Sequence, residues 1–293
     1  MGGPASLTVD PKPDQVWLAE RVLQKSIELL DNIEALYSRY KGYSTVSLIN
    51  QRAGSGTFTH IDIEFRTILN IAGQLWEESN GLFDPTVGIL NQVWDFQIGR
   101  PTSLVKLEQL LEKVGWQNVQ VNKTGVHLAK SGMEIDLGGL VKEFAADKIA
   151  KLFRNHGLSS ALIELAGDIV AIGNQYNGKP WKVGIKNPID TSTSLCTVNL
   201  TNTAICSSGN YERRFIFEGR SVSHLLNPTT GWPTKGPKSV SVIGDSALVA
   251  GSISTVACLK SSDDCKTWLE MVGLPWLIVD SDNKCFGSII DSI

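Results

Sequence analysis

The order of the periodic segments constrains the fold of this chain more than any other feature of its sequence. Apolar residues recur with a helical period through most of the first half, whereas short extended runs separated by turn residues fill the stretch from 161 to 243. Helices and strands separated along the chain in this way are typical of an α+β fold. We therefore expect an α+β protein and not a doubly wound α/β sheet.

The expected elements follow from this periodicity. Helices are predicted over residues 14–37, 61–79 and 103–115, from the end of the 136–139 segment to residue 156, from near 245, and from about 262 to 273. Extended segments are predicted over residues 161–165, 181–185, 197–200, 214–217, 221–226 and 239–243.

Length and composition exclude several classes of protein. The 293 residues suffice for one large domain or two modest lobes with a real core. A net charge of −3 without a basic block argues against nucleic-acid binding. No apolar run reaches the length of a membrane span, so no transmembrane segment is expected. The first ten residues lack the basic and apolar regions of a signal peptide, which leaves the compartment open.

The sequence contains no arrangement of residues that predicts a common metal site or a phosphate-binding loop. The five cysteines contain no C-x-x-C pair, and we expect scattered buried thiols. The four histidines are too dispersed to predict a zinc site. Residues 173–179 have the spacing of a phosphate loop, but Pro180 and a predicted strand follow, so this segment is expected to be a plain turn.

Polar and glycine residues gather where the predicted elements begin and end. Residues 81–88 follow the second helix, and residues 136–142 open the fourth. Glycines let a ligand approach the backbone, and a helix N-terminus offers free N–H groups to a phosphate. Lys142, expected in the first turn, opposes the helix dipole, which favours an anionic ligand there. An ordinary glycine-rich cap remains the alternative. His224, after a later strand, is either a structural histidine or a functional one.

Together and in order, these segments resemble the ApbE-type flavin transferases over nearly the whole chain. The matching stretches are residues 1–3, 37–40, 44–50, 80–87, 136–142, 208–209, 224–231 and 239–242. The resemblance implies a single domain over 1–293, made of two intimately packed lobes with antiparallel sheets, flanking helices and an FAD cleft between them. It also implies transfer of FMN from FAD to a threonine hydroxyl of an acceptor protein, with Mg²⁺ as cofactor and AMP released. The implied location is the periplasmic side of the bacterial inner membrane, or the cytoplasm if Met1 is the native start.

The resemblance also implies roles for individual residues. Lys142 would neutralise pyrophosphate charge, and His224 is a candidate general base toward the acceptor hydroxyl. The carbonyl of Gly139 and the hydroxyl of Thr255 would ligate the metal, with position 251 as a third ligand. The residues expected to bind FAD are Met1, Tyr40, Leu82, Phe83, Asp84, Asp136, Lys142, Ser208 and Leu226.

Gly251 departs from this pattern, since the family sequence A-D-x-x-x-T has an aspartate there. Without its carboxylate, Mg²⁺ would be held weakly, although the phosphates of FAD could supply charge. If that is the only defect, Gly251→Asp should restore Mg²⁺ binding. Glu143 and Asn210 also depart, from a glycine and an aspartate.

Three origins of the glycine stay open: natural divergence, an engineered change, or a misalignment for which Asp245 or Asp168 compensates. Two alternative functions stay open as well. One is an FAD-binding homologue with impaired catalysis, and the other is a Mg²⁺-dependent FAD pyrophosphatase that gives FMN and AMP.

Overall fold

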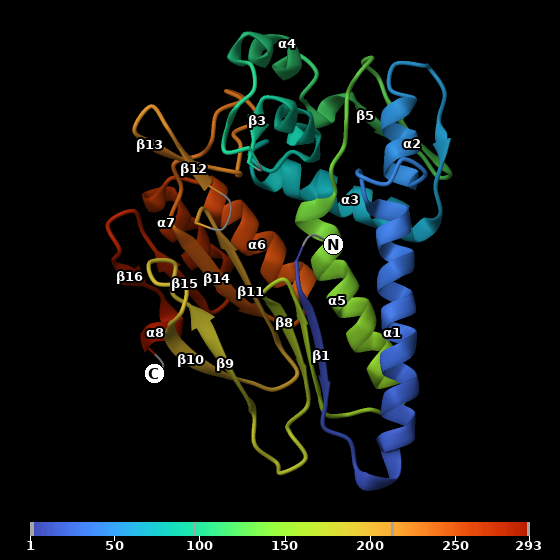
Figure 1. Ribbon diagram of the computed structural model, residues 1–293, viewed down its shortest axis with the longest axis vertical. Coiled ribbons are helices and arrows are strands. Elements are labelled where there is room, and N and C mark those ends of the chain that lie inside the picture. The colour runs from blue at the N-terminus through green and yellow to red at the C-terminus, as the bar shows by residue number, and fades with distance from the viewer. Residues whose placement is uncertain (1–2, 97, 212–213, 292–293) are drawn as a thin grey trace.

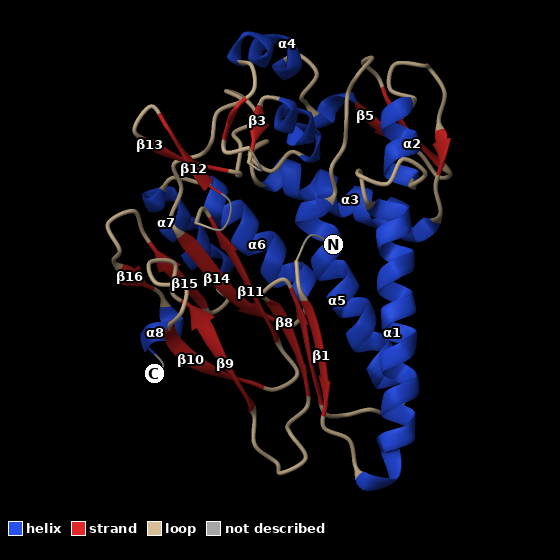
Figure 2. Ribbon diagram, in the orientation of Figure 1, coloured by secondary structure: helices blue, strands red, loops and turns tan. Residues whose placement is uncertain are grey.

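A seven-stranded antiparallel sheet forms the centre of the protein (Figures 1 and 2). The computed structural model describes residues 3–96, 98–211 and 214–291. The strands lie in the order β1 (Ala5–Val9), β7 (Ala161–Leu165), β8 (Asp168–Ile172), β11 (Ala204–Gly209), β14 (Ser239–Gly244), β15 (Trp276–Val279) and β16 (Cys285–Phe286). Every neighbouring pair in this sheet is antiparallel, which confirms the α+β prediction.

Helices cover one face of this sheet. The helices involved are α1 (Val16–Tyr37), α5 (Gly138–Asn155), α6 (Ala247–Leu259) and α7 (Ser262–Val272). α5 packs over β7 and β8, α6 packs over β11 and β14, and the two helices contact each other. Their apolar faces belong to the largest hydrophobic cluster of the described residues. The contact between α5 and α6 brings together the two segments that carry most of the predicted catalytic and metal-binding residues.

A two-stranded hairpin covers the other face. It consists of β9 (Trp181–Lys186) and β10 (Ser194–Leu200). Residues of β9 alternate between buried and exposed, so that Trp181, Val183 and Ile185 pack inward. They meet Ala171 and Ile205 from the main sheet. The central strands are thus buried on both faces.

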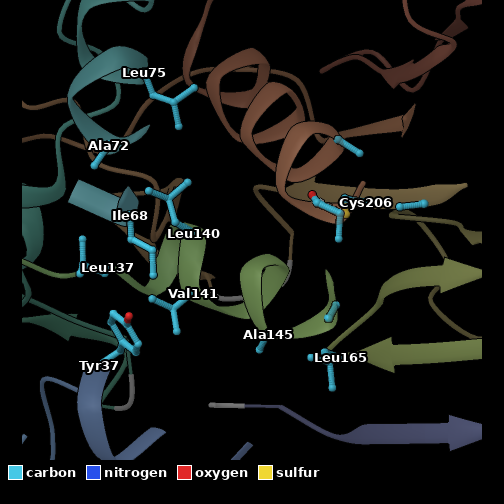
Figure 3. Close-up of a cluster of buried hydrophobic side chains, with 14 of the residues drawn as sticks. Tyr37, Ile68, Ala72, Leu75, Leu137, Leu140, Val141, Ala145, Leu165 and Cys206 are labelled. Carbon is cyan, nitrogen blue, oxygen red and sulfur yellow. Dashed lines mark hydrogen bonds between the residues drawn. The ribbon is translucent and has the colours of Figure 1, made fainter. Parts of the chain in front are cut away.

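The remaining elements pack at one end of this layered core (Figure 1). Tyr37 at the end of α1 and Ile68 of α3 lie in one cluster with Leu137, Leu140 and Val141, which fixes the start of α5 (Figure 3). A second cluster surrounds the buried Trp94. The elements of this end are α2 (Thr45–Gln51), α3 (Ile63–Glu78), α4 (Leu107–Leu111), β2 (Thr59–His60), β3 (Trp94–Asp95), β4 (Arg100–Pro101), β5 (Val119–Val121), β6 (Gly125–Leu128), β12 (Arg214–Phe217), β13 (Arg220–Ser223) and the 3₁₀ segments Pro85–Gln92, Leu104–Lys106 and Trp116–Asn118, while Pro13–Gln15 precedes α1 and α8 (Ser288–Asp291) follows β16.

Most predicted helices match the structure closely, and the strands less so. The segment predicted as a helix over 103–115 is a 3₁₀ turn followed by α4, which ends at Leu111. The strand predicted over 221–226 ends at Ser223. Ser208 lies within β11. The strands β1, β8, β11 and β15 were not predicted as extended segments.

Other expectations have mixed outcomes. None of the five cysteines forms a disulfide, but only Cys206, Cys258 and Cys265 are buried, so the expectation of buried thiols is wrong for Cys196 and Cys285. Residues 173–179 form a turn between β8 and β9, as predicted. Within the described ranges, no helix is both long and apolar enough to cross a bilayer. The division into two lobes stays a prediction.

Candidate functional site

The two glycine-rich motifs meet at the start of α5. The backbone N–H of Asp136 donates to the carbonyl of Pro85 at 2.8 Å, and the Asp136 carboxylate accepts from the N–H of Gly138 at 2.9 Å. Gly139 lies against Phe83, where a Cβ would stand 3.3 Å from the ring. Residues 81–88 and 136–142, about fifty positions apart, therefore form one corner of the molecule.

Asp84 holds this corner together from inside. One carboxylate oxygen accepts from the N–H and hydroxyl of Thr86, at 2.8 and 2.6 Å, and the other accepts from the N–H of Trp116 at 2.9 Å. The residue is only 6% exposed. Both carboxylate oxygens thus accept hydrogen bonds from the protein and hold the loop in shape. That Asp84 contacts FAD stays a prediction.

Arg39 is a site residue that the sequence did not single out, although it lies within a motif of the resemblance. Its guanidinium pairs with Glu134 at 2.8 Å and with Asp136 at 3.4 Å. A Cβ at Gly88 would overlap this guanidinium and stand 2.7 Å from Cβ of Asp136, so only glycine fits there. The exposed ring of Tyr40 lies 5.6 Å from the guanidinium carbon.

Lys142 forms the centre of a buried charge cluster. It is the fifth residue of α5, so the prediction that placed it in the first turn is wrong. Its ammonium pairs with Asp168 of β8 and lies 3.5 Å from Oε1 of Glu143. Burial alone lowers the pKa of Lys142, but the two carboxylates outweigh burial and hold that pKa above its usual value. Lys142 is therefore charged at neutral pH, and carboxylates already face it.

Glu143 is among the most deeply buried carboxylates of the described residues, at 3% exposure. Burial raises its pKa well above the ordinary glutamate value, Lys142 lowers that pKa, and Asp168 raises it further. Asp168 itself is 1% exposed and accepts a hydrogen bond from the N–H of Ser207 at 3.1 Å. The sequence named Asp168 only as a compensating aspartate, and its distance along the chain hid its contact with Lys142.

Gly251 of α6 faces Glu143 across the helix contact. A Cβ on residue 251 would overlap Cγ of Glu143 and stand 3.1 Å from Cδ and Oε1. A side chain at 251 therefore requires Glu143 to move. The expectation that Gly251→Asp would by itself restore a metal site stays a prediction, and in this chain the new side chain would have to displace Glu143.

Thr255 and Ser208 lie together, as expected of two site residues. The Ser208 hydroxyl is 3.1 Å from that of Thr255 and 2.9 Å from that of Ser254. Ser254 donates to the carbonyl of Gly251 at 3.0 Å. Positions 251 and 255 are one helical turn apart and share a face of α6.

The segment after β13 carries two of the predicted site residues, His224 and Leu226, which have different surroundings. Half-buried His224 lies edge-on to Phe96, with ring centroids 6.3 Å apart. Leu226 is 4% exposed and packs in the cluster around Trp94, which makes it a core residue. Nearby, the amide of Asn210 donates to the carbonyl of Pro237 at 2.8 Å, a bond that the aspartate of the family pattern could not make.

An open groove of about 700 Å³ lies beside this segment. Its volume is within the size range of small-molecule sites. Of the predicted FAD residues, Leu82 lines it. Lys142 instead borders a smaller cavity of about 120 Å³ beside Leu165. The groove is lined by Asn80, Leu82, Asn227, Thr230, Pro233, Thr234, Lys235, Leu259, Lys260, Ser261, Asp264, Thr267, Trp268 and Met271.

Other site predictions have no structural counterpart. Met1 lies outside the described residues. In the part of the chain that the structure describes, no three His, Cys, Asp or Glu side chains gather in a group that could hold a metal ion. A metal at the α5–α6 contact would thus depend on few carboxylates, with carbonyl, hydroxyl or phosphate oxygens as the other ligands.

Comparisons with known proteins agree with this architecture. The chain is 28% identical over 277 residues to the FAD:protein FMN transferase of Haemophilus influenzae, covering 90% of this chain and 80% of that protein. It is 29% identical to the enzyme of the same name from Treponema pallidum, covering 92% and 81%.

Solved structures are similar as well. The ApbE protein of Thermotoga maritima superposes with a TM-score of 0.85 at 27% identity, covering 98% of this chain and 93% of that one. The flavin transferase ApbE of Vibrio cholerae shares the fold, with a TM-score of 0.86 at 23% identity over 98% and 94% of the two chains. The sequence profile of the ApbE family matches residues 1–278, and the chain belongs to that family.

Proposed function

We propose that the protein transfers FMN from FAD to the hydroxyl group of a threonine in an acceptor protein and releases AMP, with Mg²⁺ as cofactor. Family membership and relatives named FAD:protein FMN transferase support this reaction class. The observation that carries it furthest is the meeting of the 81–88 and 136–142 motifs beside the α5–α6 contact. The corner joins a backbone that a ligand can approach with the half-buried ammonium group of Lys142.

The reaction replaces the phosphoanhydride bond between FMN and AMP with a phosphoester bond between FMN and the acceptor. The acceptor hydroxyl oxygen bonds to the FMN phosphorus, the pyrophosphate P–O bond breaks, and AMP leaves with the electron pair of that bond. Such transfers depend mainly on positioning and charge neutralisation. Lys142 would neutralise charge on the pyrophosphate, and His224 would take the proton from the acceptor hydroxyl.

The residues present fit a divalent cation at the α5–α6 contact, because a buried Glu143 oxygen there has no hydrogen-bond donor. The carbonyl of Gly139, which lies at an exposed position, and the hydroxyl of Thr255 would hold Mg²⁺ together with a carboxylate. When bound, the ion supplies charge neutralisation at the pyrophosphate.

FAD would lie in the groove and reach toward the α5 corner. Leu82 would contact it directly, and the exposed Tyr40 is available to cover a bound ligand. Phe83 and Asp84 would shape the loop, while Asp136 holds the start of α5. Ser208 would act through Thr255. Contacts of Met1 and the location on the periplasmic side stay proposals drawn from the resemblance.

One incubation tests the proposal against its alternatives. The protein is mixed with FAD, Mg²⁺ and a flavin-accepting protein, and covalent flavin is read by fluorescence on a denaturing gel alongside AMP in solution. Labelled acceptor with equimolar AMP is the expected result. Free FMN and AMP without labelled acceptor would identify a pyrophosphatase. Tight FAD retention with no product would identify an impaired binding protein. Lys142→Met serves as the inactive control.

A further inference from the structure

Two departures from the family pattern face each other in space. Glu143 adds a carboxylate to α5 where the pattern has glycine, and Gly251 removes one from α6 where the pattern has aspartate. A Cβ on residue 251 would overlap Cγ of Glu143 and stand 3.1 Å from Oε1. The Glu143 side chain thus occupies the space into which a side chain at 251 would extend.

The Glu143 carboxylate is also incompletely satisfied. The residue is 3% exposed, and Oε2 has no hydrogen-bond partner among the described residues. A buried carboxylate oxygen without a partner is costly, and buried charges in proteins are usually paired or bound to metal ions. Oε2 is therefore an acceptor that lacks a ligand at the face of α6 that bears Thr255.

Lys142 does not fully pair the Glu143 carboxylate. Its ammonium pairs more closely with Asp168 than with Glu143, whose Oε1 lies 3.5 Å away. With both carboxylates ionised, the cluster would carry one excess negative charge. A cation at Oε2 would balance that charge.

We infer that Glu143 supplies, from α5, the carboxylate ligand for a divalent cation that the family pattern supplies from position 251 on α6. The ion would lie at the α5–α6 contact, with Thr255 and the carbonyl of Gly139 as the other protein ligands. This inference rests on the proposed function only for the identity of the ion as Mg²⁺. It also explains why no group of three ionisable ligands is found in the described residues, since carbonyl and hydroxyl oxygens complete the set.

A purely structural role for Glu143 explains less. Asp168 alone already gives Lys142 an ion-pair partner, so a second buried carboxylate is not needed for that purpose. The metal-ligand assignment accounts for the glutamate, the glycine and the free oxygen together.

Direct binding of Mn²⁺ to the full chain tests the inference, with free Mn²⁺ followed by its electron paramagnetic resonance signal. Titrations are made with and without FAD. Glu143→Gln keeps the size of the side chain and removes its charge. We expect it to weaken Mn²⁺ binding by at least the roughly 10–100-fold that loss of an outer-shell partner costs. FAD affinity in EDTA, read by flavin fluorescence, should stay unchanged, which a general loss of structure would not allow.

The decisive variant exchanges the two positions. Glu143→Gly/Gly251→Asp returns the carboxylate to α6 and clears the space for it, so we expect most of the Mn²⁺ affinity to return. Gly251→Asp alone should not strengthen binding, because Glu143 fills the space. Glu64→Gln is the matched control, since it removes an exposed carboxylate that pairs with Lys148 away from the site.

Three results would overturn the inference: no Mn²⁺ binding by the wild type, full binding by Glu143→Gln, or an exchange variant that is folded by circular dichroism and binds as weakly as Glu143→Gln. If Glu143→Gln does not fold, Glu143→Asp keeps the charge but shortens the reach, and its affinity should fall below that of the wild type. Equal affinity would contradict the assignment. If the binding pattern holds while no FMN is transferred, the proposed function fails and this inference stands.

Discussion

The packing of Glu143 against Gly251 predicts that the effect of Gly251→Ala on the free energy of unfolding depends on residue 143. The substitution should destabilise the wild type and stabilise a variant that lacks the Glu143 side chain. Gly251→Ala removes a glycine from the interior of α6, which by helix propensity alone should stabilise the protein by up to about 1 kcal/mol. In the wild type, however, the new methyl group overlaps Cγ of Glu143. Overpacking of this kind costs about 1–3 kcal/mol. The net effect expected in the wild type is therefore a destabilisation of about 0–3 kcal/mol.

The same substitution should be stabilising once Glu143 is shortened. In a Glu143→Ala background the overlap is gone, so Gly251→Ala should add up to about 1 kcal/mol. The coupling between the two positions is then about 1–3 kcal/mol, as expected of side chains in contact. Urea unfolding followed by tryptophan fluorescence measures it, with EDTA present because a bound metal would add its own stabilisation. Equal stabilisation in both backgrounds would refute the packing argument.

Three further predictions concern the elements around the site. Asp84→Ala leaves two buried N–H groups without an acceptor and should cost about 2–4 kcal/mol in urea unfolding, whereas Asp84→Asn, which keeps one acceptor oxygen, should cost less. Asp147→Ala should cost about 1–3 kcal/mol by the same assay, because its carboxylate accepts from two N–H groups in the first turn of α6; an unchanged midpoint would contradict this. Exposed Cys285 should react with Ellman's reagent at pH 8. Burial raises the pKa of Cys265 to about 12, and since the thiolate is the reactive form, Cys265 should react only after urea is added.

The sequence predicted helices better than strands for a physical reason. α1 and α3 each expose one face to water, so their apolar residues recur with a clear period. β15, by contrast, is buried at all four positions, because helices cover one face of the sheet and the β9–β10 hairpin the other. Its residues therefore lack the alternation of a half-buried strand. β9, which covers the sheet and exposes every second residue, was predicted correctly.

The site was predictable as a set of segments but not as a set of contacts. Motif order located residues 81–88, 136–142 and 250–255, and the structure brings the first two together. Their internal roles depend on packing that no local pattern shows. Asp84 has the residue type of a ligand and acts as a loop anchor, and Asp168 reaches Lys142 only because α5 lies over β8.

Glu143 and Gly251 show most clearly what the third dimension adds, because each looks like a defect when taken alone. A chain with glutamate and aspartate at these positions would force two side chains into one space and place three carboxylates around Lys142. A chain with glycine at both would leave the α5–α6 contact without either of these carboxylates. Each single change is thus unfavourable, while the pair is compatible with a folded site. On the proposed metal-ligand assignment, the two positions would act as one unit that places a single carboxylate between α5 and α6, and either helix could provide it.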